Sequence, residues 1–231
     1  MNIIQWDINT FYAINSISNP LLNLFMAVIT HLGSGLFIGT LSLLIFLITK
    51  NRELKKIVVL ILIGLAIHAI LITPVKLAVD RERPPDILKG TPIPDVCEKC
   101  PPPKVLEHEW GPSFPSGHAG RLFIIATLLW PSRRKMRKFA YFSILLGIVI
   151  SISRIYVGMH FPLDVIFGAG FGIVAGYITL LLEKRLEFFS SLYLLQNIFK
   201  RAFLRNQIHF HAFFGDGFGG QITNSDDFRV F

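Results

Sequence analysis

Long apolar runs, separated by short charged segments, dominate this sequence. A helix needs roughly 20 apolar residues to cross a bilayer, so such runs predict membrane-spanning helices rather than the core of a water-soluble protein. We therefore predict an all-α, polytopic membrane helical bundle with about five transmembrane helices, of which the third and fourth are short by this criterion. The expected helices cover residues 21–49, 57–79, 115–130, 139–154 and 162–182.

The segments outside these runs complete the expected organisation. Residues 1–19 mix apolar and polar side chains, and we expect an interfacial N-terminal helix there rather than a span. The membrane domain is expected over residues 20–185, with a long outer loop at residues 80–114. Residues 186–231 then form a C-terminal segment on the cytoplasmic side. The end of this segment is rich in Gly and Asp, and we expect it to be disordered.

Basic residues fall between the apolar runs. The net charge of +8 could indicate a nucleic-acid partner, but charges at the ends of spans instead orient a membrane protein and meet anionic head groups. With alternating helices, the basic clusters share one face, which the positive-inside rule makes cytoplasmic. We therefore expect no nucleic-acid partner, an integral cell (inner) membrane location, and an outer loop on the extracytoplasmic face. The clusters are Lys50, Arg52, Lys55 and Lys56, then Arg133, Arg134, Lys135, Arg137 and Lys138, then Lys184 and Arg185.

Small residues recur at every fourth position of the last two predicted helices. This spacing lets helix backbones approach closely in a membrane, so we expect these positions at helix–helix contacts. They are Ser143, Gly147 and Ser151, followed by Gly168, Gly172 and Gly176.

Three groups of ionisable residues are expected to meet on the outer face. The first is Lys76 with Arg83, which Pro84 follows. The spacing is about two helical turns, so both cations can share one face of a helix that Pro84 helps to end. A lysine and an arginine directed into one pocket suit a phosphoryl group. The alternative is that both side chains anchor a helix end at the membrane surface.

The second group runs from Pro115 through Ser116 and Gly117 to His118, where a predicted helix starts. Backbone N–H groups at a helix N-terminus bind anions, and glycine permits a close approach of the backbone. The Ser116 hydroxyl can add a hydrogen bond, and His118 can supply a proton. The alternative is an ordinary helix start that Ser116 caps.

The third group is Ser153, Arg154, His160 and Asp164. Arg154 adds a third cation. Proline is tolerated at a helix start, so we expect the last helix to begin at Pro162 with His160 just outside it. Asp164 in the first turn can then hold one imidazole nitrogen and leave the other free to attack. The alternative is a favourable charge at the helix N-terminus beside a histidine at head-group level.

Together the three groups resemble the type 2 phosphatidic acid phosphatase superfamily, which also contains vanadium haloperoxidases and glucose-6-phosphatase. The family pattern is Lys-x6-Arg-Pro, then Pro-Ser-Gly-His, then Ser-Arg-x5-His-x3-Asp, and every fixed position agrees in order and spacing. The resemblance covers about residues 5–182, and Asp7 and residues 30–34 are also similar to bacterial members. Many members have six spans, so a helix before residue 20 is missing from the expected pattern.

The resemblance implies a role for each site residue. His160 is the expected nucleophile, which forms a phosphohistidine, and Asp164 orients it and stabilises its cationic form. His118 is expected to protonate the leaving oxygen and then to activate water. Phosphoryl transfer depends mostly on positioning and charge stabilisation, so we expect cations to replace metal ions and no cofactor to be needed. The phosphoryl oxygens are expected to be held by Lys76, Arg83, Ser116, the Gly117 amide and Arg154.

Cys97 and Cys100 lie in the outer loop, outside this pattern. On an extracytoplasmic face a local disulfide is the favoured interpretation, and free thiols are an alternative. A zinc site that includes His108 is a further alternative, although it lacks a clear fourth ligand.

A site at the outer membrane boundary predicts an amphiphilic substrate. Similarity to small bacterial members favours undecaprenyl or another polyprenyl pyrophosphate, followed by phosphatidylglycerol phosphate and phosphatidic acid. One alternative is a lipid phosphotransferase, which passes the phosphoryl group from His160 to a lipid acceptor. A non-enzymatic alternative is a transporter or lipid-binding protein, which predicts polar residues deep within several helices. Here the key charges instead gather at one interface.

Overall fold

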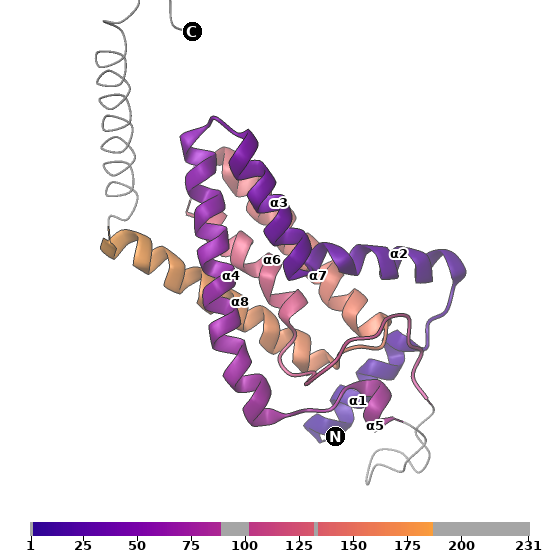
Figure 1. The fold of residues 1–231 in the computed structure, drawn as a ribbon. Helices are drawn as coiled ribbons and strands as arrows, with labels where there is room; N and C mark the ends of the chain where they lie inside the picture. Colours follow the sequence, from indigo (N-terminus) through magenta and orange to yellow (C-terminus); the bar gives the residue numbers. More distant parts are fainter. Residues whose placement is uncertain (1, 89–101, 132–133, 187–231) are drawn as a thin grey trace, which may run out of the picture. The chain divides into compact units, whose positions relative to one another are not determined.

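The computed structural model describes residues 2–88, 102–131 and 134–186, and Met1–Arg185 forms one compact unit. The described residues form helices and connecting loops without a β-strand (Figure 1). This confirms the predicted all-α membrane bundle. The helices are α1 (Ile3–Asn15), α2 (Pro20–Thr30), the short 3₁₀ helix η1 (His31–Gly33), α3 (Gly35–Ile48), α4 (Arg52–Val79), α5 (Pro84–Ile87), α6 (Gly117–Leu129), α7 (Arg134–Tyr156) and α8 (Pro162–Leu186).

Three helical segments in the described part of the chain are long and apolar enough to cross a membrane. Arg52–Ile87, Met136–Tyr156 and Pro162–Arg185 lie at the positions of the second, fourth and fifth predicted spans. α3 and α6 are apolar but shorter. α1 and the segment Pro20–Gly33 pass the same test only as a pair, which is bent by 118°.

The predicted continuous helix over residues 21–49 is wrong, because η1 interrupts the chain between α2 and α3. Ser34 follows the break and caps α3 with its hydroxyl. The break lies against α7, so that a Cβ atom at Gly33 would be 2.8 Å from the Ile150 side chain. Arg121 of α6 donates a hydrogen bond to the Gly33 carbonyl at 3.0 Å. This contact satisfies a backbone acceptor at the interruption.

The expectation that Lys76 and Arg83 share one helix face is also wrong. α4 carries Lys76 in its last turn and ends at Val79, after which Asp80 adopts a left-handed conformation with φ 43° and ψ 42°. Arg83 therefore lies beyond the helix, at the N-cap of α5. Pro84 begins α5 rather than ending α4. The two cations thus approach the site from a helix end and from a loop.

α6 is largely buried and packs closely against its neighbours (Figure 1). A Cβ atom at Gly172 of α8 would lie 2.1 Å from the carbonyl oxygen of Gly120 in α6, and one at Gly168 would lie 2.2 Å from the backbone at the start of α6. On α7, the Ser143 hydroxyl donates to the Leu122 carbonyl of α6 at 2.7 Å. The predicted role in helix contacts is therefore confirmed for Ser143 and for the four glycines, Gly147, Gly168, Gly172 and Gly176.

Four helix ends meet where the predicted site residues lie. α4 and α7 end there, and α6 and α8 begin there (Figure 1). The Ser116 amide donates to the Asp164 carbonyl at 2.8 Å, which joins the start of α6 to the start of α8. The Asn15 side chain, at the end of α1, donates to the Tyr156 carbonyl at 2.9 Å and joins α1 to the end of α7. These contacts hold the ends of separate helices around one site.

A buried apolar cluster connects α1 to the same end of the bundle. Burial of such side chains is the main favourable term in folding, so α1 is an integral part of the structure around the site. The cluster contains Ile8, Phe11, Leu88, Ala119, Ile155, Phe161 and Val165.

Cys97 and Cys100 lie outside the described residues, as do residues 187–231. The disulfide, its free-thiol and zinc alternatives, and the disordered end of the chain therefore stay predictions.

Gly172→Ala is expected to destabilise the protein, because its methyl group cannot fit without moving α8 away from the α6 backbone. Overpacking costs about 1–3 kcal/mol, which corresponds to a fall in melting temperature of roughly 2–10 °C for a chain of this size. Tryptophan fluorescence of the detergent-purified protein measures this. Gly170→Ala is the matched control in α8, because no atom of another described element lies within 4 Å of the added Cβ. Equal melting temperatures for the two variants would contradict the close contact.

Candidate active site

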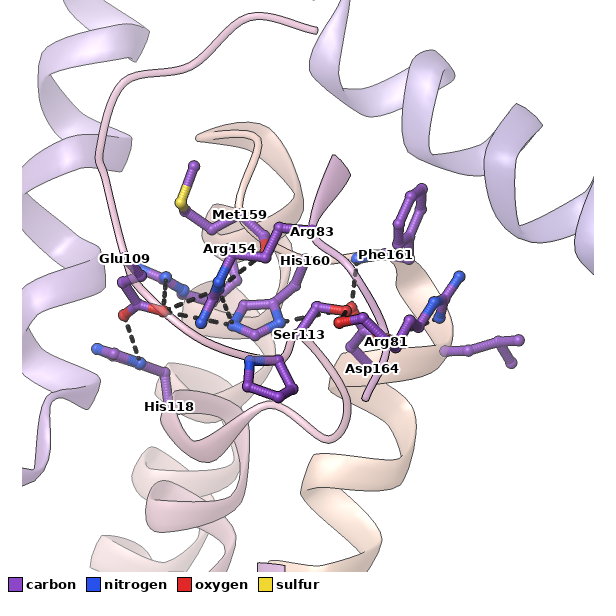
Figure 2. A network of polar contacts seen from close by, with 12 residues as sticks. Arg81, Arg83, Glu109, Ser113, His118, Arg154, Met159, His160, Phe161 and Asp164 are labelled. Atoms are coloured by element: carbon purple, nitrogen blue, oxygen red, sulfur yellow. Dashed lines mark hydrogen bonds and ion pairs between the residues drawn. The ribbon is translucent and has the colours of Figure 1, made fainter. Parts of the chain in front are cut away.

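His160 stands in the turn between α7 and α8 and is 1% exposed. Its Nδ1 lies 3.4 Å from Oδ2 of Asp164, and the same oxygen accepts a hydrogen bond from the Phe161 amide at 2.9 Å. The other ring nitrogen, Nε2, lies 3.4 Å from Nη1 of Arg83 (Figure 2). One nitrogen thus faces a carboxylate, and the other faces Arg83.

A tight turn brings His160 to this position. Gly158 has a φ of 87°, which other residues rarely adopt, and a Cβ atom there would lie 2.2 Å from the carbonyl oxygen of Lys104. The His160 amide donates to the Arg154 carbonyl at 3.3 Å. Pro162 then begins α8, as the sequence predicts, and leaves His160 outside the helix.

Arg154 lies in the last turn of α7 and is fully buried. Its Nη1 donates to the Thr30 hydroxyl at 3.0 Å and to Oε2 of Glu107 at 2.7 Å. Its Nη2 forms an ion pair with Oε2 of Glu109 at 2.9 Å. A buried guanidinium requires such partners, because an uncompensated charge in this position would be strongly destabilising.

Arg83 approaches the same carboxylate from the segment after α4. Its Nη1 lies 3.0 Å from Oε2 of Glu109 and donates to the Met159 carbonyl at 3.1 Å. Lys76 instead donates to the Pro112 carbonyl at 2.6 Å. Two of the three predicted cations therefore meet at one carboxylate oxygen, and the third binds the loop that carries this carboxylate.

Ser116 is the N-cap residue of α6, but its side chain makes no capping hydrogen bond. The hydroxyl is buried and has no hydrogen-bond partner among the described residues. The alternative in which Ser116 acts only as a helix cap is therefore contradicted. Gly117 begins α6, where the first backbone N–H groups of a helix have no partner within it. The hydroxyl and this helix start are both available to an anion.

Glu109 is the central residue that the sequence analysis missed. Its Oε2 contacts Arg83 and Arg154 and lies 3.7 Å from Nε2 of His160, while its Oε1 lies 3.4 Å from Nδ1 of His118. The carboxylate is therefore placed between the two histidines and against two arginines (Figure 2). A negatively charged group thus occupies the position expected for a phosphoryl group. Glu109 lies outside the three motifs, so their spacing carried no signal for it.

The environment of Glu109 keeps its carboxylate ionised. Burial by itself raises the pKa of this carboxyl, but the nearby His160 ring and the positive charge of Arg154 outweigh burial and hold the pKa well below its usual range. A depressed pKa in the folded state means that the ion pairs persist until the pH falls through that low value. Mild acidification therefore does not release Glu109 from the cations.

Arg81 and Asp7 are two further residues that the motifs did not identify. Arg81 bridges two carboxylates, with its Nη1 2.7 Å from Oδ1 of Asp164 and its Nη2 2.6 Å from Oδ2 of Asp7. Arg81 falls between the fixed positions of the first motif, where the pattern allows any residue. Asp7 was indicated only by its similarity to bacterial family members.

The site is built from alternating positive and negative groups. Within the described ranges, no group of three or more His, Cys, Asp or Glu side chains is arranged to hold a metal ion. The negative groups are instead paired with Arg81, Arg83 and Arg154.

Comparison with known proteins identifies the family of this chain. Residues 53–187, which contain all three motifs, match the model of the PAP2 superfamily. The chain belongs to the PAP2 superfamily. LpxE from Aquifex aeolicus is similar in structure, with 30% sequence identity, a TM-score of 0.60, and coverage of 76% of this chain and 94% of LpxE. A transmembrane PAP2-type phosphatidylglycerolphosphate phosphatase from Bacillus subtilis has 26% identity, a TM-score of 0.60, and coverage of 80% and 88%.

A relative in sequence is the bacitracin transport permease protein BcrC of Bacillus licheniformis, which is 34% identical over 85 residues. The aligned part covers 37% of this chain and 40% of BcrC, so it extends over less than half of either protein. Family membership and the membrane helical bundle support an activity as a membrane lipid phosphatase.

Ser116→Ala is expected to lower the kcat/KM of this PAP2 protein about 100- to 1,000-fold, the effect of losing one donor to a reacting oxyanion. Its melting temperature should change by less than about 2 °C, because alanine removes no capping bond. Ser34→Ala is the matched control, since the Ser34 hydroxyl does cap α3. That variant should lose stability and keep its kcat/KM. If Ser116→Ala instead lost stability and kept its kcat/KM, the Ser116 hydroxyl would be structural.

Glu109→Gln is expected to tighten competitive inhibition by inorganic phosphate by roughly 3- to 10-fold and to lower KM, because an anion no longer has to displace a carboxylate from the arginines. Steady-state kinetics with added phosphate measure both values. Glu82→Gln, an exposed glutamate near Arg83, is the control and should behave as the wild type. Weaker phosphate inhibition in Glu109→Gln would show that Glu109 supports the bound anion instead of competing with it.

Proposed function

We propose that this chain hydrolyses a lipid phosphate or pyrophosphate through a phosphohistidine intermediate on His160, without a metal ion. The observation that carries this proposal is the position of the Glu109 carboxylate. It lies within reach of both histidines and against Arg83 and Arg154. A phosphoryl group that takes the place of this carboxylate would meet a nucleophile, a proton donor and two cations at once.

In the proposed first step, Nε2 of His160 attacks phosphorus and the bond from phosphorus to the leaving oxygen breaks. His118 gives its proton to that oxygen, so that the leaving lipid alcohol or phosphate departs with its charge reduced. The imidazole ring carries a positive charge once Nε2 is bonded to phosphorus. Asp164, which is 3.4 Å from Nδ1, stabilises this charge and keeps the ring oriented.

In the proposed second step, water attacks the phosphohistidine. His118, which is now neutral, accepts the proton of the water, and the bond between phosphorus and Nε2 of His160 breaks. Inorganic phosphate then leaves, and both histidines return to their starting protonation states. The same residue therefore acts as an acid and then as a base, as in other two-step transfers.

Charge stabilisation by side chains is the basis for proposing that no metal ion is needed. The phosphoryl oxygens gain negative charge that donors fixed in advance can stabilise. Apart from Glu109, Arg83 is held by the Met159 carbonyl and Arg154 by Thr30 and Glu107, so both guanidinium groups can keep their positions when an oxyanion replaces the Glu109 carboxylate. Lys76, the Ser116 hydroxyl and the Gly117 amide complete the proposed set of donors.

The favoured substrate is undecaprenyl or another polyprenyl pyrophosphate, and the active site is proposed to face the extracytoplasmic side of the cell membrane. The orientation rests on the basic segments at the opposite helix ends. Phosphatidylglycerol phosphate is the second candidate, because a phosphatase described as acting on this lipid shares the fold over 88% of its length. Phosphatidic acid is the third.

Phosphate release by the detergent-purified protein tests the proposal. We expect release from at least one of the three lipids in the presence of EDTA, and a loss of at least about 1,000-fold in His160→Ala. His108→Ala is the matched control, because His108 is an exposed histidine of the same loop as Glu109. A phosphoenzyme bond that is labile to acid and stable to alkali should be trapped in the wild type only.

Three outcomes would count against parts of the proposal. Loss of activity with EDTA would contradict the metal-independent mechanism. Activity in His160→Ala would contradict the assignment of the nucleophile. Transfer of the labelled phosphoryl group to an added lipid alcohol, without release of phosphate, would identify a phosphotransferase.

A further inference from the structure

Asp7, Arg81, Asp164 and His160 form a continuous chain of polar contacts. The Arg81 guanidinium lies between two carboxylates, 2.6 Å from Asp7 and 2.7 Å from Asp164. Both carboxylates are 0% exposed, whereas the Arg81 side chain is 22% exposed. Oδ2 of Asp164, the oxygen that Arg81 does not contact, faces Nδ1 of His160. This series of polar contacts therefore connects α1 to the proposed nucleophile through one arginine, Arg81.

Several contacts fix this arrangement. The guanidinium carbon of Arg81 lies 4.2 Å from the centre of the Phe161 ring, and the Arg81 carbonyl accepts a hydrogen bond from the Ser113 amide at 2.7 Å. Oδ1 of Asp7 accepts from the Leu163 amide at 2.8 Å. Asp7 from α1 therefore binds both the arginine and the first turn of α8. Such restraint from separate elements is what a positioning role requires.

Asp7, Arg81 and Asp164 carry two negative charges and one positive charge, so their charges do not cancel. If Arg81 met Asp164 alone, the two charges would largely neutralise each other, and Asp164 would favour a cationic His160 less strongly. Asp7 supplies a second negative charge on the far side of the guanidinium. Two carboxylates and one guanidinium leave a net negative charge beside His160. This charge favours the positive ring that forms when Nε2 is bonded to phosphorus.

We propose that Asp7 and Arg81 are positioning residues that set the orientation and the effective charge of Asp164, and thereby the nucleophilicity of His160. This inference rests on the proposed function, in which His160 attacks phosphorus. Neither residue touches the position of the phosphoryl group. Their effect reaches the reaction only through Asp164.

Other charged or titratable groups also lie near His160, and the variants compared below retain them. They are Glu109 from the loop before α6, Arg83 from the segment before α5, His118 from α6 and Arg154 from α7, together with Asp164 of α8. Variants of Asp7 and Arg81 keep all of these side chains, and Asp164 is the one among them that Arg81 contacts. A difference between variants therefore reports the contribution of the Asp7–Arg81 pair through Asp164.

The test is the pH dependence of kcat/KM for Asp7→Asn and Arg81→Gln, with an aryl phosphate as substrate. An aryl leaving group departs without a proton from His118, so the acid limb of kcat/KM reports the protonation of His160. Ionisation of the substrate itself is common to all variants and cancels in the comparison. Glu82→Gln is the control for loss of a nearby exposed carboxylate and should match the wild type.

We expect the acid limb to move in opposite directions in the two variants. Asp7→Asn removes a negative charge, which disfavours protonated His160, so the limb should move to lower pH by at least about half a unit. Arg81→Gln removes a positive charge and should move the limb to higher pH by a similar amount. Both variants should lower kcat by roughly 10-fold or more and change KM by less than about threefold.

Arg81→Lys keeps the proposal testable if a neutral variant fails to fold. Lysine retains the charge but cannot bridge two carboxylates with a fork. Its acid limb should stay within about 0.3 unit of the wild type while its kcat falls. A merely structural role would instead move stability alone, or move the acid limbs of all variants in one direction.

The His160→Ala variant distinguishes a failure of the proposed function from a failure of the positioning role of Asp7 and Arg81. If this variant keeps the wild-type turnover, the proposed function fails and the inference fails with it. If His160→Ala is inactive, the proposed function stands. Unmoved acid limbs with unchanged kcat in the Asp7 and Arg81 variants then overturn the inference alone.

Discussion

The buried charge of Arg154 is the constraint around which this end of the molecule is organised. A fully buried guanidinium requires partners, and Glu107, Glu109 and Thr30 supply them from α2 and from the loop before α6. Binding these partners draws the loop over the helix ends and carries Glu109 against Arg83 as well. The need to balance one charge therefore brings together segments that are far apart in sequence.

The same balance explains how the site can stay ordered before substrate arrives. An empty cluster of arginines would repel itself, and its members would move apart or turn to solvent. Glu109 supplies a negative charge at the place where the substrate is proposed to bind, so the cations keep their positions. Substrate binding then exchanges one anion for another. Little reorganisation is needed at the moment of reaction, which is the main requirement for electrostatic catalysis.

Local rules allowed much of the architecture to be read from the sequence. The length of the apolar runs identified the three segments Arg52–Ile87, Met136–Tyr156 and Pro162–Arg185, because the bilayer thickness sets a minimum length for a membrane-crossing helix. Pro162 marked the start of α8 and left His160 outside it, because proline fits the first turn of a helix and not its interior. Gly168 and Gly172 marked close helix contacts because only small residues permit them. Each of these features depends on a few neighbouring residues.

The tertiary structure decided the features that depend on distant neighbours. The helix break beside Gly33 is stabilised by Arg121 of another helix. Arg81 bridges Asp7 of α1 and Asp164 of α8, two helices that are far apart in the sequence. Glu109 belongs to no motif, and its place in the site follows from the arginines that it neutralises. The sequence by itself determined the long apolar helices and the start of α8, and its motifs predicted the candidate catalytic residues. Only the fold decided how the buried charges are paired, because that pairing depends on distances in space and not on separation along the chain.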